Sequence, residues 1–287
     1  MTREIPVWTV DSFTSSPFSG NPAGVCLLDN HDEVNDDTKQ KIAAEMNISE
    51  TCFVVPVDQE DFSHASLFSL RWFTPTDEVP LCGHGTLATA TVLWQEKKNV
   101  NSVIRFETLS GILTAKYEDG QVVMDLPLYP GESCKEGEFS ALVEVLSCGF
   151  PVKDVLLSSP MKYLMVVLED EVTRRELEAC MPDIGAMPSL ERSGRVKGVI
   201  LTVNGDSDFD FYSRHFDPWQ GVPEDPVTGS THTVMAPYWG KRLGRERMRA
   251  RQCSRRGGEM ELVMRRDQGR LEIRGNATLV MSGHLLL

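Results

Sequence analysis

Two short glycine-containing segments of similar design constrain the fold most strongly. The first covers residues 81–88 and reads LCGHGTLA, and the second covers residues 225–233 and reads DPVTGSTHT. Gly83 and Gly229 lie 146 positions apart, about half of the 287 residues. In each segment small residues form a tight turn, hydroxyl or imidazole side chains follow, and a helical stretch begins at once. This spacing predicts a duplicated architecture in which each half supplies one wall of a site.

A turn of this kind directs free backbone N–H groups and the positive end of a helix dipole toward a ligand. Two such turns that face each other are suited to hold a carboxylate or an enolate. We therefore assign Gly83, Gly85, Gly229 and Ser230 to substrate binding, because only small residues let a ligand approach the backbone closely.

Composition and charge limit the class of protein. With 41% hydrophobic residues, the chain is long enough for a large core and for two domains. A net charge of −13 argues against a nucleic-acid partner. The seven cysteines form no CxxC pair and are odd in number, so we expect reduced thiols in an intracellular protein. No apolar run has the length of a signal peptide or of a membrane span, which predicts a cytoplasmic protein with no membrane partner.

The sequence carries no pattern typical of a metal or nucleotide site. Its six histidines show no HxxxH or HxH spacing, and the cysteines lack zinc pairing. Neither GxGxxG after a strand nor GxxxxGK[ST] is present. We expect no metal and no cofactor. The basic stretch at residues 241–256 is interpreted as a solvated face, with an acidic docking partner as the alternative.

Hydrophobic periodicity predicts an α+β fold. Residues 86–94 are apolar nearly all round, as in a helix buried inside a domain, and a second helix carries Val234, Met235 and Tyr238. Each half therefore reads as a curved, mostly antiparallel sheet or barrel around one central buried helix. The expected strands cover residues 7–13, 23–28, 51–55, 67–73, 103–108, 112–117, 122–126, 163–168, 196–203 and 209–216. A short amphipathic helix is expected over residues 38–46, and Pro127, Pro130 and Gly131 mark a linker.

Four motifs in order carry a family resemblance. They are GNP at residues 20–22, SETCFV at 49–54, PLCGHGT at 80–86 and EDPVTGS at 224–230. Together they resemble the PhzF family of phenazine-biosynthesis-like proteins, and QCSRRGGE at residues 252–259 further resembles its vertebrate branch.

The resemblance implies the diaminopimelate-epimerase-like fold, which has two pseudo-symmetric lobes with the active site in the cleft between them. The implied lobes are residues 1–126 with 277–287, and residues 127–276. The last strand, expected at residues 277–282, then crosses back to complete the first lobe.

The resemblance also implies the roles of the site residues. Glu50 matches the catalytic acid/base, His84 and Asp225 match polar residues that assist it, and Asn21 and Thr228 join the substrate-binding set. The implied chemistry is a cofactor-free isomerisation, in which a proton leaves one carbon of a small carboxylated metabolite and returns to another. A partly desolvated carboxyl suits this chemistry, since its pKa rises toward neutrality and it can both accept and donate a proton.

From the residues alone, other interpretations stay open. Glu50 can cap a helix, His84 can be a structural histidine, and Asp225 can stabilise a turn. Epimerases of the same fold use two cysteines, one before each glycine turn, whereas here Cys82 is matched by Thr228. A threonine hydroxyl cannot replace a thiolate as a carbon-acid base.

Two alternatives to the isomerase therefore remain. One is a dehydratase or epimerase-like enzyme that depends on Cys82. The other is a non-catalytic regulatory scaffold that binds protein partners, since vertebrate-branch members are associated with such partners. A homodimer is a further expectation from the family.

Overall fold

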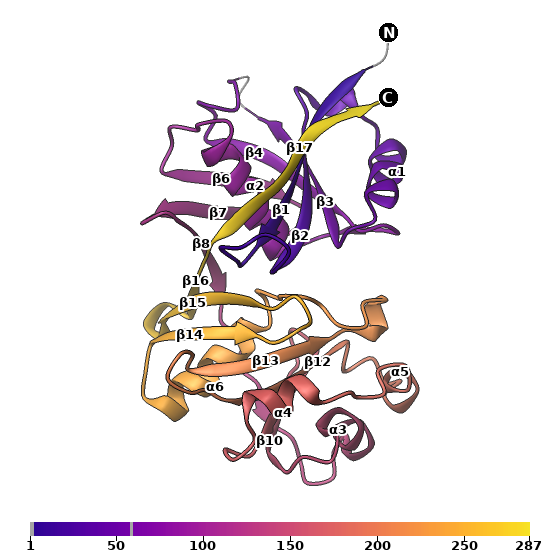
Figure 1. Ribbon diagram of the computed structural model, residues 1–287, viewed down its shortest axis with the longest axis vertical. Helices are drawn as coiled ribbons and strands as arrows, with labels where there is room; N and C mark the ends of the chain where they lie inside the picture. Colours follow the sequence, from indigo (N-terminus) through magenta and orange to yellow (C-terminus); the bar gives the residue numbers. More distant parts are fainter. Residues whose placement is uncertain (1–2, 58–59) are drawn as a thin grey trace. The chain divides into compact units, whose positions relative to one another are not determined.

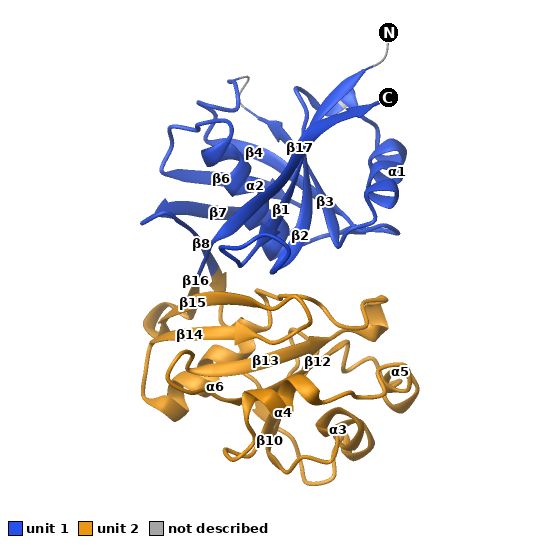
Figure 2. Cartoon of the chain, in the orientation of Figure 1, with its two compact units in different colours: residues 1–125, 274–287 blue, residues 126–273 orange. Residues whose placement is uncertain are grey.

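The computed structural model describes residues 3–57 and 60–287, and the chain divides into two compact units. Unit 1 consists of Met1–Asp125 and Arg274–Leu287, and unit 2 consists of Leu126–Ile273 (Figure 2). Each unit has its own set of strands and its own central helix (Figure 1). The predicted α+β architecture is confirmed. Among the described residues, no helix is long and apolar enough to cross a membrane.

Unit 1 is a sheet wrapped around one helix. Its strands are β1 (Glu4–Ser12), β2 (Asn21–Leu27), β3 (Glu50–Pro56), β4 (Leu67–Phe73), β5 (Glu78–Val79), β6 (Val103–Thr108), β7 (Gly111–Glu118), β8 (Gln121–Pro127) and β17 (Ala277–Leu286). Its helices are η1 (His31–Glu33), α1 (Asp36–Met46) and α2 (Gly83–Gln95). The residues of α2 from His84 to Trp94 are all buried, and α2 packs on β1, β2, β3, β7 and β17. The helix predicted to be buried is therefore the centre of this unit.

The last strand of the chain completes the sheet of unit 1. β17 pairs antiparallel with β1, as the resemblance implied. The strand extends to Leu286, four residues beyond the expected end at Ser282. From β17 the hydrogen-bonded order runs through β1, β2, β3, β4, β6, β7 and β8.

Unit 2 repeats the plan. Its strands are β9 (Glu132–Ser133), β10 (Val152–Ser158), β11 (Tyr163–Leu168), β12 (Gly198–Asn204), β13 (Phe211–Phe216), β14 (Arg247–Gln252), β15 (Gly258–Arg265) and β16 (Arg270–Gly275). Its helices are α3 (Ser140–Ser147), α4 (Arg174–Ala179), α5 (Met187–Leu190), η2 (Pro218–Gln220), α6 (His232–Leu243) and η3 (Arg266–Gln268). β11 is buried along its whole length, which is typical of a strand covered on both faces.

The strand pairings show the duplication directly. From β1 to β7 the successive pairs are antiparallel, parallel, antiparallel, parallel and antiparallel. From β10 to β15 the same alternation occurs. The central helix enters at the same point in both units, since α2 lies between β4 and β6, and α6 lies between β13 and β14. The separation of the two glycine segments by about half of the chain thus reflects a repeated topology.

Two expectations need correction. Cys148 and Cys180 form a disulfide, so the prediction that all seven cysteines are reduced thiols is wrong for these two. Each caps the C-terminus of a helix, α3 or α4, and their Cα atoms lie 5.8 Å apart. Because they are 32 positions apart in the sequence, a search for close pairs does not detect them. In addition, α6 does not begin at once after Gly229. It starts at His232, because an extra turn comes first.

The basic stretch at residues 241–256 is largely ion-paired within unit 2. The pairs are Arg242 with Asp170, Arg245 with Asp210, Arg247 with Glu261, and Arg251 with Glu259. These acids neutralise much of the positive charge that the sequence suggested.

Candidate active site

Glu50 and His84 form the centre of the candidate site in unit 1. Glu50 is the first residue of β3, and His84 is the second residue of α2. The Glu50 Oε2 and His84 Nε2 atoms lie 2.9 Å apart. The His84 side chain is 8% exposed and the Glu50 side chain is 18% exposed. The Glu50 side chain is thus mostly covered but remains partly exposed to solvent.

The second ring nitrogen of His84 fixes which tautomer is present. Asn21 Nδ2 lies 3.3 Å from His84 Nδ1. Ser49 Oγ donates to Asn21 Oδ1 at 3.0 Å, so the amide group of Asn21 turns its nitrogen toward the imidazole. An amide nitrogen is only a donor, so His84 Nδ1 accepts and Nε2 carries the proton. The protonated Nε2 of His84 therefore faces Glu50 Oε2 in an ion-pair contact, although the two atoms form no hydrogen bond with each other.

Cys82 lies on the other side of the same ring. It is the N-cap of α2, its Sγ accepts from the Gly85 N–H at 3.3 Å, and it is 3.4 Å from His84 Nδ1. Ligand atoms of Glu50, Cys82 and His84 lie within 4.8 Å of one another, a grouping that could hold a metal ion and that the spacing rules missed. However, Glu50 and Cys82 contact opposite nitrogens of the ring, whereas one ion binds one ring nitrogen. The arrangement suits a chain of proton donors and acceptors better than a metal centre.

The two glycines of the first segment differ in their surroundings. A Cβ on Gly85 would lie within 3.0 Å of the Trp72 ring and of the sulfurs of Cys52 and Cys82. Gly85 is thus required by packing against its own unit. A Cβ on Gly83 would meet nothing within 4 Å. Contact of either glycine with a substrate stays a prediction.

Asp225 belongs to a polar cluster within unit 2. Its Oδ2 accepts a hydrogen bond from the Thr228 hydroxyl, and the Thr228 Oγ1 lies 3.0 Å from His215 Nδ1. Burial lowers the pKa of His215 to about 3, so its imidazole is neutral. Because the Thr228 hydroxyl proton is given to Asp225, His215 donates to the Thr228 oxygen. The three groups form one directed chain that ends on the Asp225 carboxylate.

Gln252 locks the turn that carries these residues. The Gln252 side chain is fully buried, donates to the Asp225 carbonyl at 2.7 Å, and accepts from the Thr228 N–H at 2.9 Å. The Tyr163 hydroxyl lies 3.3 Å from Ser230 Oγ. The polar groups of the second glycine segment are therefore held in place by strands far away in the sequence.

Sequence reasoning missed three members of this cluster. They are His215, Gln252 and Asp217. The available signal was weak: Gln252 opens the motif at residues 252–259, and His215 lies in a strand that reads as buried. Burial, together with the negative charge of Asp225, raises the pKa of Asp217 to about 7, so Asp217 is partly protonated near neutral pH. The structure brings Asn21, Glu50 and His84 together in unit 1 and Asp225 and Thr228 together in unit 2.

Comparison with known structures defines the class of fold. A hydroxyproline epimerase from Agrobacterium vitis has a similar fold, with a TM-score of 0.55 and 14% sequence identity. The match covers 99% of this chain and 93% of the epimerase. The two-unit α+β architecture is thus that of an epimerase-like fold. A PhzF-family protein from Enterococcus faecalis matches with a TM-score of 0.87 and 34% identity, covering 99% of this chain and all of that chain.

Sequence comparison shows the family. The PhzC-PhzF family of phenazine biosynthesis-like proteins matches residues 10–283, and this chain belongs to that family. The mouse phenazine biosynthesis-like domain-containing protein 2 is 46% identical, covering 98% of this chain and 99% of the mouse protein. An uncharacterised isomerase from Pseudomonas aeruginosa is 42% identical, covering 99% of this chain and all of that protein. The resemblance seen in the motifs is confirmed.

Proposed function

We propose that this protein is a cofactor-free isomerase that moves a proton on a small carboxylated metabolite. The observation that carries the proposal is the 2.9 Å ion-pair contact between Glu50 Oε2 and His84 Nε2, made by a side chain that is partly exposed. The naming of the Pseudomonas aeruginosa relative as an isomerase, and the fold shared with an epimerase, support this class of enzyme.

In this mechanism Glu50 acts first as a base and then as an acid. The carboxylate takes a proton from one carbon of the substrate, so a C–H bond breaks and an O–H bond forms. The electron pair is delocalised onto the substrate. Glu50 then gives the proton to a different carbon, which restores the carboxylate. One residue can serve both steps because the proton need not leave the site.

His84 and Asn21 position the Glu50 carboxyl group. His84 Nε2 lies 2.9 Å from one carboxyl oxygen, and Asn21 keeps the imidazole in the tautomer with its proton on Nε2. The other carboxyl oxygen can then face the substrate carbon. Binding of an anionic substrate group by the second glycine segment is assigned to Gly229 and Ser230, because the N–H and hydroxyl of Thr228 already donate to Gln252 and Asp225.

The test is deuterium uptake from heavy water into small cyclic carboxylic acids and amino acids. We expect Glu50→Gln to lower the exchange rate by about 10³-fold or more, because an amide cannot carry the proton. Glu45→Gln is the matched control, since Glu45 is an exposed acid on α1 of the same unit. If Glu50→Gln exchanges at the wild-type rate, the mechanism is wrong. If no compound exchanges at all, a non-catalytic scaffold is favoured.

A second candidate is chemistry that depends on Cys82. The 3.4 Å contact between Cys82 Sγ and His84 Nδ1 favours it, because a histidine beside a thiol can assist the formation of a thiolate. In that case Cys82→Ala abolishes turnover and Glu50→Gln spares it. The proposed isomerase requires the opposite pattern, so the two variants separate the candidates.

A further inference from the structure

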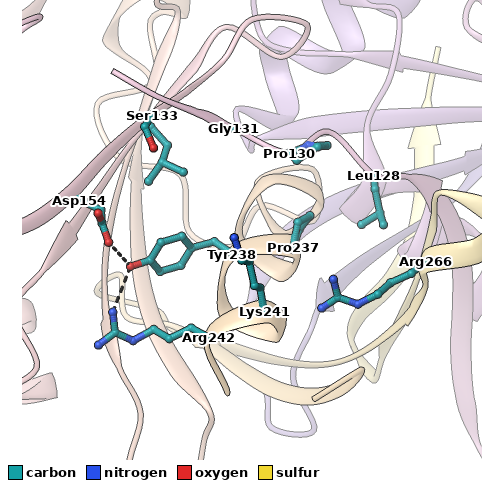
Figure 3. A pocket seen from close by; sticks show the side chains of 11 residues that line it. Leu128, Pro130, Gly131, Ser133, Asp154, Pro237, Tyr238, Lys241, Arg242 and Arg266 are labelled. Carbon is teal, nitrogen blue, oxygen red and sulfur yellow. Dashed lines mark hydrogen bonds between the residues drawn. The ribbon is translucent and has the colours of Figure 1, made fainter. Parts of the chain in front are cut away.

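A cavity of about 740 Å³ opens on one face of α6, within unit 2 and apart from the polar clusters described above (Figure 3). Its volume is in the range of small-molecule sites. Four segments that are far apart in the sequence contribute to its wall: residues 128–133, the strand β10, the C-terminal half of α6, and Arg266 of η3. None of the lining residues belongs to the proposed acid/base site.

The apolar part of the wall is held in a fixed position. It includes Leu128, Pro130 and Pro237. A proline inside a helix has no N–H to give to the carbonyl four residues earlier. In α6 that carbonyl belongs to Thr233, and the Tyr129 N–H donates to it at 3.1 Å. The segment at residues 128–131 is thus hydrogen-bonded to the helix, and the cavity between them is preformed.

The segment has two further anchors. The Leu128 N–H donates to the Gly269 carbonyl at 2.9 Å. The Ser158 hydroxyl donates to the Tyr129 carbonyl at 3.0 Å. Hydrogen bonds to α6, to β10 and to the residue after η3 keep this side of the cavity from collapsing onto α6.

Tyr238 and its partners form a polar wall that is already satisfied. The Tyr238 hydroxyl donates to Asp154 Oδ2 at 2.6 Å and accepts from Arg242 Nη1 at 3.2 Å, as the dashed lines in Figure 3 show. Arg242 also pairs with Asp170. Burial raises the pKa of Tyr238 to about 12, so it stays a neutral phenol. This network leaves the aromatic ring of Tyr238 as a surface for a ligand to pack on.

Two cations at the cavity lack a close acidic partner. Lys241 has no ion pair within the described part of the chain, and the nearest acid to Arg266 is Glu246, at 3.9 Å from the Arg266 Nε. The Arg266 side chain is 44% exposed, and its guanidinium points toward α6 in Figure 3. The helix dipole stabilises a cation near the helix C-terminus, which explains why Lys241 lies there. That role does not account for Arg266, which comes from another element.

We propose that this cavity binds an organic anion, namely an apolar ring that carries one carboxylate, sulfonate or phosphate monoester group. The ring packs on Tyr238, Pro237 and Leu128, while the anionic group lies between Lys241 and Arg266. An arginine fork binds such planar or tetrahedral anions through two parallel hydrogen bonds, and a lysine adds a point charge. The site is separate from the one that would hold the substrate of the proposed isomerase.

The probe for the test is 1-anilinonaphthalene-8-sulfonate, an aromatic anion whose fluorescence rises in an apolar cavity. Its dissociation constant is measured for the full chain by titration at low salt. We expect the double variant Lys241→Glu with Arg266→Glu to bind at least 10-fold more weakly. The control is Arg192→Glu, an exposed arginine of the same unit outside the cavity, which should bind as the wild type does.

A second variant tests the cavity without changing charge. Ser133 is exposed at the rim, so Ser133→Trp fills the space with little effect on the fold and should also abolish binding. The neutral analogue N-phenyl-1-naphthylamine should bind more weakly than the sulfonate, and 1-naphthoate and 1-naphthyl phosphate should displace the probe.

Three results would overturn the proposal. The first is an unchanged dissociation constant in the double variant. The second is equal affinity for the neutral analogue. The third is a changed molecular mass of the double variant in light scattering, since that would make the cavity an interface between two copies of the chain.

Discussion

The two units share one sequence of strand pairings but not one set of chemical groups. In unit 1 the parallel ladder of β2 and β3 begins with Ala23 opposite Glu50. In unit 2 the matching ladder of β11 and β12 begins with Tyr163 opposite Gly198. The position that carries a carboxyl group in one unit therefore carries no side chain in the other. Glu50 and Gly198 thus occupy equivalent backbone positions in the two units, and only Glu50 carries an acid.

The central helices differ in a related way. α2 is buried over His84 to Trp94, and its first turn contacts Glu50 through His84. α6 leaves one face open, on which the cavity of unit 2 lies. The histidine at its start, His232, is fully buried and bonds the Thr228 carbonyl through Nδ1 at 2.9 Å. A histidine near the helix start thus contacts a carboxyl group in unit 1 and a backbone carbonyl in unit 2.

Substitution of each histidine in turn is the strongest test of this difference between the two units. We expect His84→Phe to lower deuterium exchange by about 10²–10³-fold, because the Glu50 carboxyl loses the group that orients it. His232→Phe should leave exchange within a few-fold of wild type and lower the unfolding free energy instead, since burial already holds the pKa of His232 at about 4 and its imidazole neutral. Equal losses of exchange in both variants would contradict the distinction.

The next effect concerns the disulfide, which is in unit 2. Replacing Cys148 and Cys180 by serine should lower the stability of unit 2 by about 3–4 kcal/mol, the loop-entropy value for a separation of 32 residues. Backbone amide hydrogen exchange should become faster in α3 and α4 and should stay unchanged in β2 of unit 1. Cys134→Ser is the control, because Cys134 is a free cysteine of unit 2. Uniform loss of protection in both units would show that they unfold together.

Asp217 makes the folding stability of unit 2 depend on pH, which provides another test of the difference between the units. Its folded pKa of about 7 lies above the ordinary value of 3.8, so its contribution to stability is full below pH 4 and is lost as pH rises through 7. When the pH rises from 5 to 8, the unfolding free energy of the wild type should therefore fall by about 2–3 kcal/mol relative to that of Asp217→Asn. Urea unfolding of both proteins at pH 5 and at pH 8 measures this difference. Asp208→Asn, an exposed matched change, should show none.

The smallest effect tests why unit 2 has glycine where unit 1 has the acid. A Cβ on Gly198 would lie 2.7 Å from His215 Nε2 and 2.9 Å from the Tyr163 ring. Gly198→Ala should therefore cost about 1–3 kcal/mol through overpacking. Gly283→Ala in β17 meets nothing within 4 Å and should be neutral or slightly stabilising. Equal unfolding free energies for the two variants would remove packing as the reason.

Local sequence patterns predicted much of the fold. The bounds of β4, β6 and β11 agree with the predicted strands, because apolar runs of strand length end there at turn residues. The predicted end of the helix at residue 46 agrees with the end of α1 at Met46, and the next residue, Asn47, adopts the left-handed conformation that ends a helix. Structural features that depend on residues close together in the sequence could therefore be predicted from it.

Contacts between distant residues were not predictable in the same way. The disulfide and the hydrogen bonds of Gln252 depend on which strands lie together, and spacing along the chain does not carry that information. The motifs predicted Glu50 and His84 as members of one site. Only the pairing of β2 with β3, and the packing of α2 against both, brings them to 2.9 Å.

The pairing of β1 with β17 has a consequence for how the chain reaches its native state. Residues 126–273 form one continuous stretch, whereas unit 1 needs residues 277–286 to pair with its first strand. During synthesis from the N-terminus, β1 emerges early and waits for its partner until unit 2 has been made. Unit 2 can then fold while one edge of unit 1 is still uncovered, and an uncovered strand edge is where chains aggregate. The part of the molecule made first is thus the last to be finished.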